Sequence, residues 1–275
     1  MTTADMPTTT DPSQMDGGVD TDQGDAANHT NLRVARSERF EDFLTDDLSR
    51  PLYMFAGDVP GTSESMCLGD CARDWPPFDV EIANLEPEIE AADVSRFHRQ
   101  DGQWQTRYKG HPLYYRRAEA GFTQVTGDAI EGRFYVARDY FTFLATARTF
   151  SPEGSAGTNS RFLTDGYGRT LYVNLDDQPS TQTSAAMSAC AAACARERPL
   201  FVAVEDDRTT LLPSTLDARD FEQLQREDGR EQVTYRGWPL YYFSGDLAAG
   251  STEGHNENAW RAFDPSTFGR EPESN

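Results

Sequence analysis

The chain has 275 residues, a length that suits two domains of ordinary size. Its 46 acidic and 25 basic residues give a net charge of −21, which argues against a nucleic-acid partner, because binding phosphate needs a basic surface, and against an anionic membrane surface. Aromatic residues make up 11% of the chain, which favours β-structure, where rings pack on a pleated face.

The basic residues are arginines, with Lys109 as the single lysine. An acid surplus with almost no lysine is typical of halophilic proteins, and codon bias combined with a solvated acidic surface produces the same composition. Charge repulsion is heavily screened in molar salt, where the Debye length falls to about 3 Å. A melting curve from low to molar salt separates the two interpretations, and a flat response would remove the halophilic one.

Residues 1–36 are rich in Thr, Asp, Gly and Ser, so we expect a disordered acidic leader that buries too little apolar area to offset its ordering entropy. No apolar segment follows Met1, and no run of 18 apolar residues exists. We therefore expect no transmembrane helix and no export signal on this chain. The last residues, 270–275, are expected to be a frayed tail.

A Leu-Tyr pair recurs four times, and its first and last copies share the pattern Tyr-x-Phe-x-x-Asp. The third copy has Asn174 where the aromatic belongs, and the second has Arg116 there. The residues of the repeat are Tyr53, Phe55, Asp58, Tyr114, Tyr172, Asp177, Tyr241, Phe243 and Asp246.

Longer similarities show a tandem duplication of roughly 110 residues, a normal domain size. Cys67-x3-Cys71-Ala-Arg returns as Cys190-x3-Cys194-Ala-Arg, and a Tyr-x-Gly-x-Pro-Leu-Tyr-Tyr stretch occurs in both halves. We expect the domains at residues 37–150 and 151–269, each containing two Leu-Tyr copies.

Local patterns predict hairpins at 38–58 and 162–173 and tight turns at Lys109-Gly110 and Arg236-Gly237. The Ala-rich residues 184–197 predict a short helix ended near Pro199. The predicted fold is mainly β: two tandem similar domains, each with one short cysteine-containing helix. A four-bladed, propeller-like ring with one blade per Leu-Tyr copy is the alternative.

Three motifs occur in the same order as in a known family: Leu-Tyr-x-Phe-x-x-Asp, Cys-x3-Cys-Ala-x-x-Trp-Pro-Pro, and Asp-Gly-x-x-Gln-x-x-Tyr-x-Gly-x-Pro-Leu-Tyr. Over residues 40–140 and 160–265 the chain resembles the secreted-repeat family of predicted lipoproteins, named for a Tyr-x-(Phe/Trp/Tyr)-x-x-Asp motif. The resemblance implies an extracytoplasmic, usually lipid-anchored protein without an established activity. The chain lacks the lipobox cysteine, and its second unit lacks Trp-Pro-Pro.

The four cysteines form two pairs with i, i+4 spacing, which on a helix places the Cα atoms about 6.2 Å apart, within reach of a disulfide. Four cysteines allow three connectivities, and the repetition favours Cys67–Cys71 and Cys190–Cys194. A structural staple in an exported protein is the main interpretation, with a redox role as the alternative. None of the four histidines lies at ligand spacing from these pairs, so neither a metal site nor another cofactor is predicted.

The tyrosines and phenylalanines of the motif are expected to alternate into a core, with Asp58 and Asp246 accepting backbone hydrogen bonds in a turn after glycine. An exposed binding surface is the alternative, with Trp75 and Trp238 as candidate surface aromatics. Truncating Tyr172 to alanine is expected to cost less stability than truncating Tyr241, because the Tyr172 copy has lost its second aromatic.

No catalytic constellation is present in the sequence. We therefore predict a non-enzymatic extracytoplasmic repeat protein, a binding or assembly module of the cell envelope whose partner is an unknown protein or small molecule. If the chain lacks an export signal altogether, a cytoplasmic location is the alternative. The alternative function is a redox protein, or an accessory to an electron-transfer chain, acting through its cysteine pairs or a bound cofactor.

Overall fold

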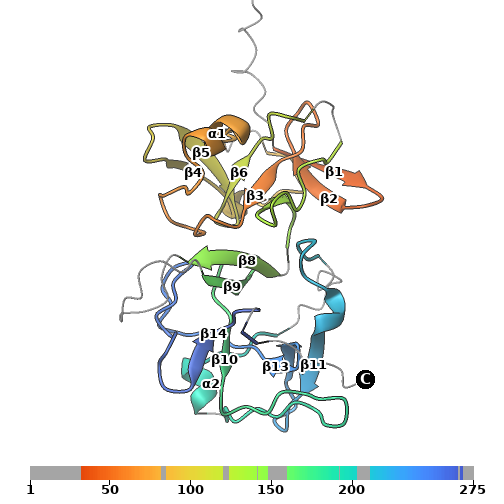
Figure 1. Cartoon of the computed structure of the whole chain (residues 1–275), viewed down its shortest axis with the longest axis vertical. Coiled ribbons are helices and arrows are strands. Elements are labelled where there is room, and N and C mark those ends of the chain that lie inside the picture. The colour runs from red at the N-terminus through yellow and green to blue at the C-terminus, as the bar shows by residue number, and fades with distance from the viewer. Residues whose placement is uncertain are drawn as a thin grey trace, which may run out of the picture.

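The computed structural model describes residues 32–81, 85–119, 124–140, 142–147, 160–191, 193–202, 211–265 and 267–268. Two bodies lie one above the other along the long axis of the molecule (Figure 1). We call residues 32–140 the first unit and residues 142–268 the second unit. The predicted leader up to residue 31 and the predicted tail at 270–275 lie outside the described residues.

The first unit is built on a five-stranded antiparallel sheet with the strand order β4-β5-β6-β3-β7. Strand β3 lies between β6 and β7 and carries the first Leu-Tyr copy, and Tyr53 on β3 pairs directly with Tyr114 on β6. A separate hairpin, β1-β2, packs beside the sheet. The elements are β1 (Arg33–Ser37), β2 (Glu41–Thr45), β3 (Tyr53–Phe55), α1 (Asp70–Asp74), the 3₁₀ turn η2 (Ala91–Asp93), β4 (Val94–His98), β5 (Trp104–Tyr108), β6 (His111–Tyr114) and β7 (Phe134–Val136).

The second unit repeats these pairings. Strand β10 pairs with β14 as β3 does with β7, strands β11-β12-β13 repeat β4-β5-β6, and a bridge joins Tyr172 to Tyr241 as Tyr53 is joined to Tyr114. The elements are β8 (Thr142–Ala147), β9 (Ser160–Asp165), β10 (Tyr172–Asn174), α2 (Cys194–Glu197), the 3₁₀ turn η4 (Ala218–Asp220), β11 (Phe221–Gln225), β12 (Glu231–Tyr235), β13 (Trp238–Pro239) and β14 (Trp260–Ala262).

The mainly β fold with two repeated units and one short cysteine-containing helix in each is therefore confirmed. The alternative ring of four blades is wrong for the part of the chain that the structure describes, because the strands there form open sheets stacked in two units. The pairing of β8 with β9 crosses the expected domain boundary at residue 150, so β8 joins the second unit just as β1 joins the first.

The alternation of side chains along β3 explains how one sheet packs against two apolar clusters. Leu52 and Met54 pack in one apolar cluster, whereas Tyr53 and Phe55 pack in another. Successive side chains of a strand point to opposite faces, so both faces of the sheet are covered. The predicted tight turn is formed: Lys109 and Gly110 both have positive φ, at 50° and 85°, as in a type I′ hairpin turn.

Two local predictions are wrong. Residues 32–36, assigned to the leader, begin the folded unit: Leu32 is fully buried and residues 33–37 pair with β2. The helix expected over 184–197 is reduced to α2, its last four residues. Upstream of it, Met187 forms a bridge with Gln178, and the Ala189 N–H donates to the Asp177 carboxylate. These tertiary bonds override the helix propensity of the alanines.

Candidate functional site

The four tyrosines of the Leu-Tyr copies are fully buried, with their side chains in the apolar clusters. Each hydroxyl donates to an acidic residue of the other copy in the same unit. The donor–acceptor pairs are Tyr114–Asp58, Tyr53–Glu119 at 2.7 Å, Tyr241–Asp177 at 2.8 Å and Tyr172–Asp246 at 2.7 Å. The repeat motif therefore holds two copies together by a reciprocal exchange of tyrosine hydroxyls and carboxylates.

Each of these carboxylates also accepts a backbone N–H from a loop further along the chain. Asp58 accepts from Met66, eight residues on, and Asp246 from Glu253, seven residues on. The acids do accept backbone bonds, as expected, but they anchor longer loops rather than a tight turn. Sequence reasoning missed Glu119, although it follows Tyr114 by the same interval as Asp58 follows Tyr53.

The interior position of the acids changes their titration. Burial is the largest effect on Asp58 and Asp177, and it raises the pKa of each to about 6 despite the hydrogen bonds they accept. Burial likewise raises the pKa of Asp246. The pKa of each partner tyrosine is also raised, chiefly by burial, so the hydroxyls remain donors at all ordinary pH values.

We expect the protein to be more stable at pH 5 than at pH 7. Between pH 4 and 6, Asp58 and Asp177 bind protons in the folded state that they release on unfolding, so the free energy of unfolding falls as pH rises through 6. His111 and His255 act in the opposite direction, because burial lowers the pKa of each, that of His111 to about 4. They are two groups against three, since the pKa of Asp246 is raised as well. Urea unfolding at pH 5 and 7 measures the difference.

The double variant Asp58→Asn, Asp177→Asn is the control for this prediction, since the amides do not titrate. Its stability should change less between pH 5 and pH 7 than that of the unmodified protein. An identical change in both proteins would show that these two carboxylates do not carry the pH dependence.

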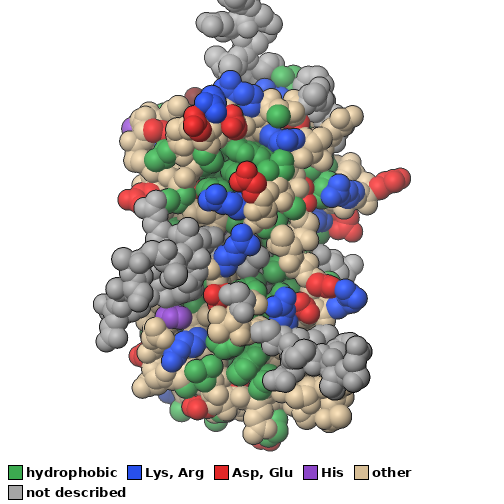
Figure 2. Space-filling view, viewed as in Figure 1, with side chains coloured by type: hydrophobic (Ala, Val, Ile, Leu, Met, Phe, Trp, Pro, Cys, Tyr) green, Lys and Arg blue, Asp and Glu red, His purple; other side chains and the backbone are tan. Residues whose placement is uncertain are grey.

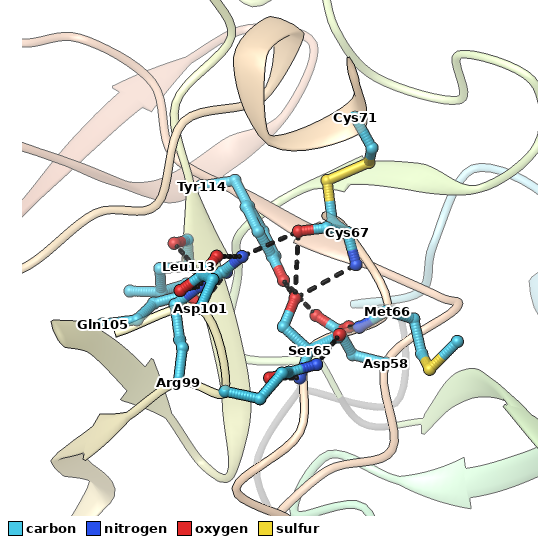
Figure 3. Close-up of a disulfide and its surroundings, with 11 residues drawn as sticks. Asp58, Ser65, Met66, Cys67, Cys71, Arg99, Asp101, Gln105, Leu113 and Tyr114 are labelled. Carbon is cyan, nitrogen blue, oxygen red and sulfur yellow. Dashed lines mark hydrogen bonds and ion pairs between the residues drawn. A yellow bond between two sulfur atoms is a disulfide. The ribbon is translucent and has the colours of Figure 1, made fainter. Parts of the chain in front are cut away.

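The structure links Cys67 to Cys71 and Cys190 to Cys194, with Cα separations of 5.1 and 5.3 Å. Contrary to the helical i, i+4 argument, the first cysteine of each pair precedes the short helix. Figure 3 shows how Cys67 is held: Ser65 Oγ accepts its N–H at 3.1 Å, and Arg99 donates to its carbonyl at 2.7 Å. Ser65 also contacts the Tyr114 hydroxyl at 2.7 Å, so the disulfide loop is coupled to the motif.

The second unit repeats this bracing around Cys190 with Ser188, Arg226 and Tyr241. In both units the arginine also donates to a buried glutamine that in turn donates to the carbonyl of the motif leucine; these glutamines are Gln105 and Gln232. These hydrogen bonds hold the backbone of Cys67 and Cys190 in place, which favours a structural role for the cysteine pairs. Within the described residues, no group of three or more His, Cys, Asp or Glu side chains could hold a metal ion.

Replacing Cys67 and Cys71 by alanine should lower the free energy of unfolding by about 2 kcal/mol, because the closed loop is short and constrains few unfolded conformations. Urea unfolding of the variant measures this loss, and the protein reduced under native conditions is the control. A loss above about 5 kcal/mol would contradict the interpretation of the bond as a local staple.

Trp75 is a core residue, which corrects its assignment as a candidate surface aromatic. Its ring stacks on Phe134 with a centroid separation of 3.8 Å and an interplanar angle of 2°, and Phe134 stacks on Phe55 at 4.4 Å. Trp238, the other candidate, is half-buried with its ring edge-on to Phe268 at 5.6 Å.

The second unit replaces Trp75 by a buried cation, Arg198, whose guanidinium lies 3.9 Å from the ring centroid of Phe243. In the first unit the cation instead stands two positions after the motif tyrosine Tyr114, where the second unit has Phe243: Arg116 lies 5.9 Å from the Trp75 ring. Ring and cation have thus changed places between the units. This exchange accounts for two departures from the repeat pattern, the lost Trp-Pro-Pro and the arginine in the second copy.

A trio of Asp, Arg and Tyr side chains occurs at the matching corner of both units. In the second unit, Asp165 Oδ2 accepts from Arg169 Nε at 2.7 Å and from the Tyr242 hydroxyl at 3.0 Å, and Arg169 Nη2 lies 3.1 Å from the same hydroxyl. The first unit repeats this arrangement with Asp46, Arg50 and Tyr115.

The trio of the second unit borders a cleft at the junction of the units, with a volume of about 310 Å³. The first unit contributes Lys109, Asp139 and Tyr140, and the second contributes Asp165, Gly166, Tyr167, Arg169, Phe201, Val202 and Tyr242. Tyr167 and Val202 are exposed, at 46% and 49%. On the face seen in Figure 2, basic side chains lie along the middle of the molecule, where the units meet.

Lys109 joins the two sides of the cleft. Its ammonium pairs with Asp139, lies 3.7 Å from Asp93, and is 4.7 Å from the ring centroid of Tyr167 on the second unit. His111, the next residue but one, is buried and hydrogen-bonds the backbone of Gly166 across the junction. His111 and Trp238 hold the same position in the two units but have different neighbours. His111 faces the second unit, whereas Trp238 packs against Phe268.

A family model described as a secreted repeat of unknown function matches residues 43–79 and 223–263. Each unit contains one segment that matches the secreted repeat. The matched segments hold the two copies with an intact Tyr-x-Phe-x-x-Asp motif, together with the first disulfide. No curated protein and no solved structure matches the chain.

The secreted-repeat segments contribute little to the cleft. Of its lining residues, only Tyr242 falls within a matched segment. The family assignment thus describes the scaffold, whereas the cleft is built from residues outside the two matches. Among the described residues, no helix is long and apolar enough to cross a membrane.

Proposed function

We propose that this protein is a non-enzymatic, extracytoplasmic repeat module that binds a small molecule in the cleft between its two units. One observation carries the proposal: an exposed tyrosine, Tyr167, stands in a cleft to which both units contribute side chains. A volume of about 310 Å³ lies within the range of small-molecule sites, which are typically concave and lined by aromatic side chains with a few placed polar groups.

The repeat motif itself does not suit a ligand. Its tyrosines have no exposed surface, and their hydroxyls are bonded to carboxylates of the same unit. The Asp-Arg-Tyr trio recurs in both units, so its internal bonds serve the scaffold. The trio of the second unit differs in its surroundings, because Lys109 and Asp139 of the first unit line the same cleft. The two disulfides support the extracytoplasmic location, because disulfides persist outside the cytosol.

Replacing Tyr167 by alanine should abolish retention of the ligand without loss of stability, since the side chain is half exposed. Small molecules extracted from native source cells are passed over the immobilised protein, and mass spectrometry identifies those retained. The matched control is Leu48→Ala, because Leu48 holds the corresponding position of the first unit and is similarly exposed, at 36%.

The proposal expects compounds that are retained by the unmodified protein and by Leu48→Ala but not by Tyr167→Ala. If Tyr167→Ala retains the same compounds as the control, binding occurs elsewhere on the molecule and the cleft is not the site.

A further inference from the structure

We infer that the ligand of the cleft is a small organic anion, a flat ring bearing a carboxylate. This inference rests on the proposed function and names the chemical class of its ligand. It follows from three features of the cleft: the carboxylates that are already bonded within the protein, the hydrogen-bond donor that has no partner, and the positions of the aromatic rings.

The carboxylates of the cleft are engaged by the protein itself. Asp165 Oδ1 accepts the backbone N–H groups of Tyr167 and Arg169 at 3.0 and 2.9 Å, and its Oδ2 accepts from Arg169 and Tyr242. Asp139 is paired with Lys109. A cationic ligand would have to displace these bonds, so the acids give it no advantage.

One cation of the cleft, Arg169, has hydrogen-bonding capacity left. Arg169 uses Nε and Nη2 in its bonds to Asp165 and Tyr242, whereas its Nη1 has no hydrogen-bond partner in the described part of the chain. Its side chain is 58% exposed. An arginine that lines a cleft, is held by one carboxylate and keeps one nitrogen unbonded is suited to a second carboxylate, because charge-assisted hydrogen bonds are the strong ones.

Ring faces accompany these donors. The Arg169 guanidinium lies 4.5 Å from the ring centroid of Tyr242, and the Lys109 ammonium lies 4.7 Å from that of Tyr167. Tyr167 is exposed and Tyr242 half-buried, so both offer an aromatic surface to a flat body. In a chain of net charge −21, this combination of cations and rings selects an anion with an aromatic body.

Three planar probes of equal shape test the sign of the charge: benzoate, benzamide and benzamidine. Lys109 is the single lysine, so protein produced with ¹³C-labelled lysine reports on the cleft through one side-chain NMR signal. Benzoate should shift this signal and bind at least about tenfold more tightly than benzamide, because the neutral amide forgoes a charge-assisted bond. Arg169→Gln should bring the affinity for benzoate down to that for benzamide, whereas the matched variant Arg50→Gln should leave it unchanged.

Tighter binding of benzamide or benzamidine than of benzoate would overturn the inference while leaving small-molecule binding in the cleft intact. So would an Arg169→Gln variant that binds benzoate as well as the unmodified protein does. If none of the three probes shifts the Lys109 signal, the aromatic-anion class is wrong, and the retention experiment with Tyr167→Ala then decides separately whether the cleft binds anything.

Discussion

Replacing Trp75 by alanine should lower the free energy of unfolding by about 3–5 kcal/mol, the cost of deleting a large aromatic side chain from a core. Trp75 is 7% exposed, stacks on Phe134 at 3.8 Å and meets the edge of Tyr53 at 5.3 Å. Its loss would leave a cavity beside strand β3, because Phe134 and Phe55 continue the same stack. Urea unfolding measures the change.

Trp104→Ala is the matched control, because Trp104 is 50% exposed on the outer hairpin of the same sheet. It should cost less than about 1 kcal/mol, as is usual for exposed positions. Equal losses of unfolding free energy in the two variants would contradict the buried position of Trp75 and support its assignment as a surface residue.

Replacing Tyr241 by alanine should also cost about 3–5 kcal/mol, since the ring is fully buried against Trp260 and its hydroxyl bonds a buried carboxylate. Tyr172→Ala should cost as much. The sequence predicted a smaller loss of stability for Tyr172→Ala than for Tyr241→Ala. The structure instead leads us to expect equal losses, because Tyr172 is as buried as Tyr241 and its hydroxyl donates to Asp246. Urea unfolding of the two variants measures both losses of free energy.

The variant Tyr241→Phe removes the hydroxyl and keeps the ring, so it measures the contribution of the hydroxyl to stability. It should cost about 2–3 kcal/mol, because Asp177 would lose a hydrogen-bond donor in a buried place. A phenylalanine variant as stable as the unmodified protein would show that the exchange of tyrosines and carboxylates between the copies does not stabilise the unit.

The repeats could be predicted from the sequence because they are local patterns. The alternation of Leu52, Tyr53, Met54 and Phe55 specifies a strand covered on both faces, and the duplicated Cys-x3-Cys favours pairing within each unit. The predicted helix over 184–197 is wrong because the alanines specify only a local preference, while Asp177, before the segment, and Tyr241, far along the chain, hydrogen-bond to it.

The cleft could not be predicted, since it depends on how one unit is placed against the other. Lys109 and Tyr167 lie in separate units, and no periodicity relates them. The exchange of ring and cation at Trp75 and Arg198 was visible as a difference between the units, but its meaning required Arg116 and Phe243 to be placed beside them. Glu119 was missed because only aspartate was sought at the fifth position after the tyrosine.

The central claim is that the repeat motif builds the scaffold while the junction between the units binds. Titration of benzoate against the ¹³C signal of Lys109 in two variants tests it directly. Tyr241→Phe should melt at a lower temperature and keep its Kd within about twofold, a difference below 0.5 kcal/mol, whereas Tyr167→Ala should keep its melting temperature and lose at least about tenfold in affinity. The reverse result, with affinity lost in Tyr241→Phe and retained in Tyr167→Ala, would contradict the claim and place binding in the repeat motif.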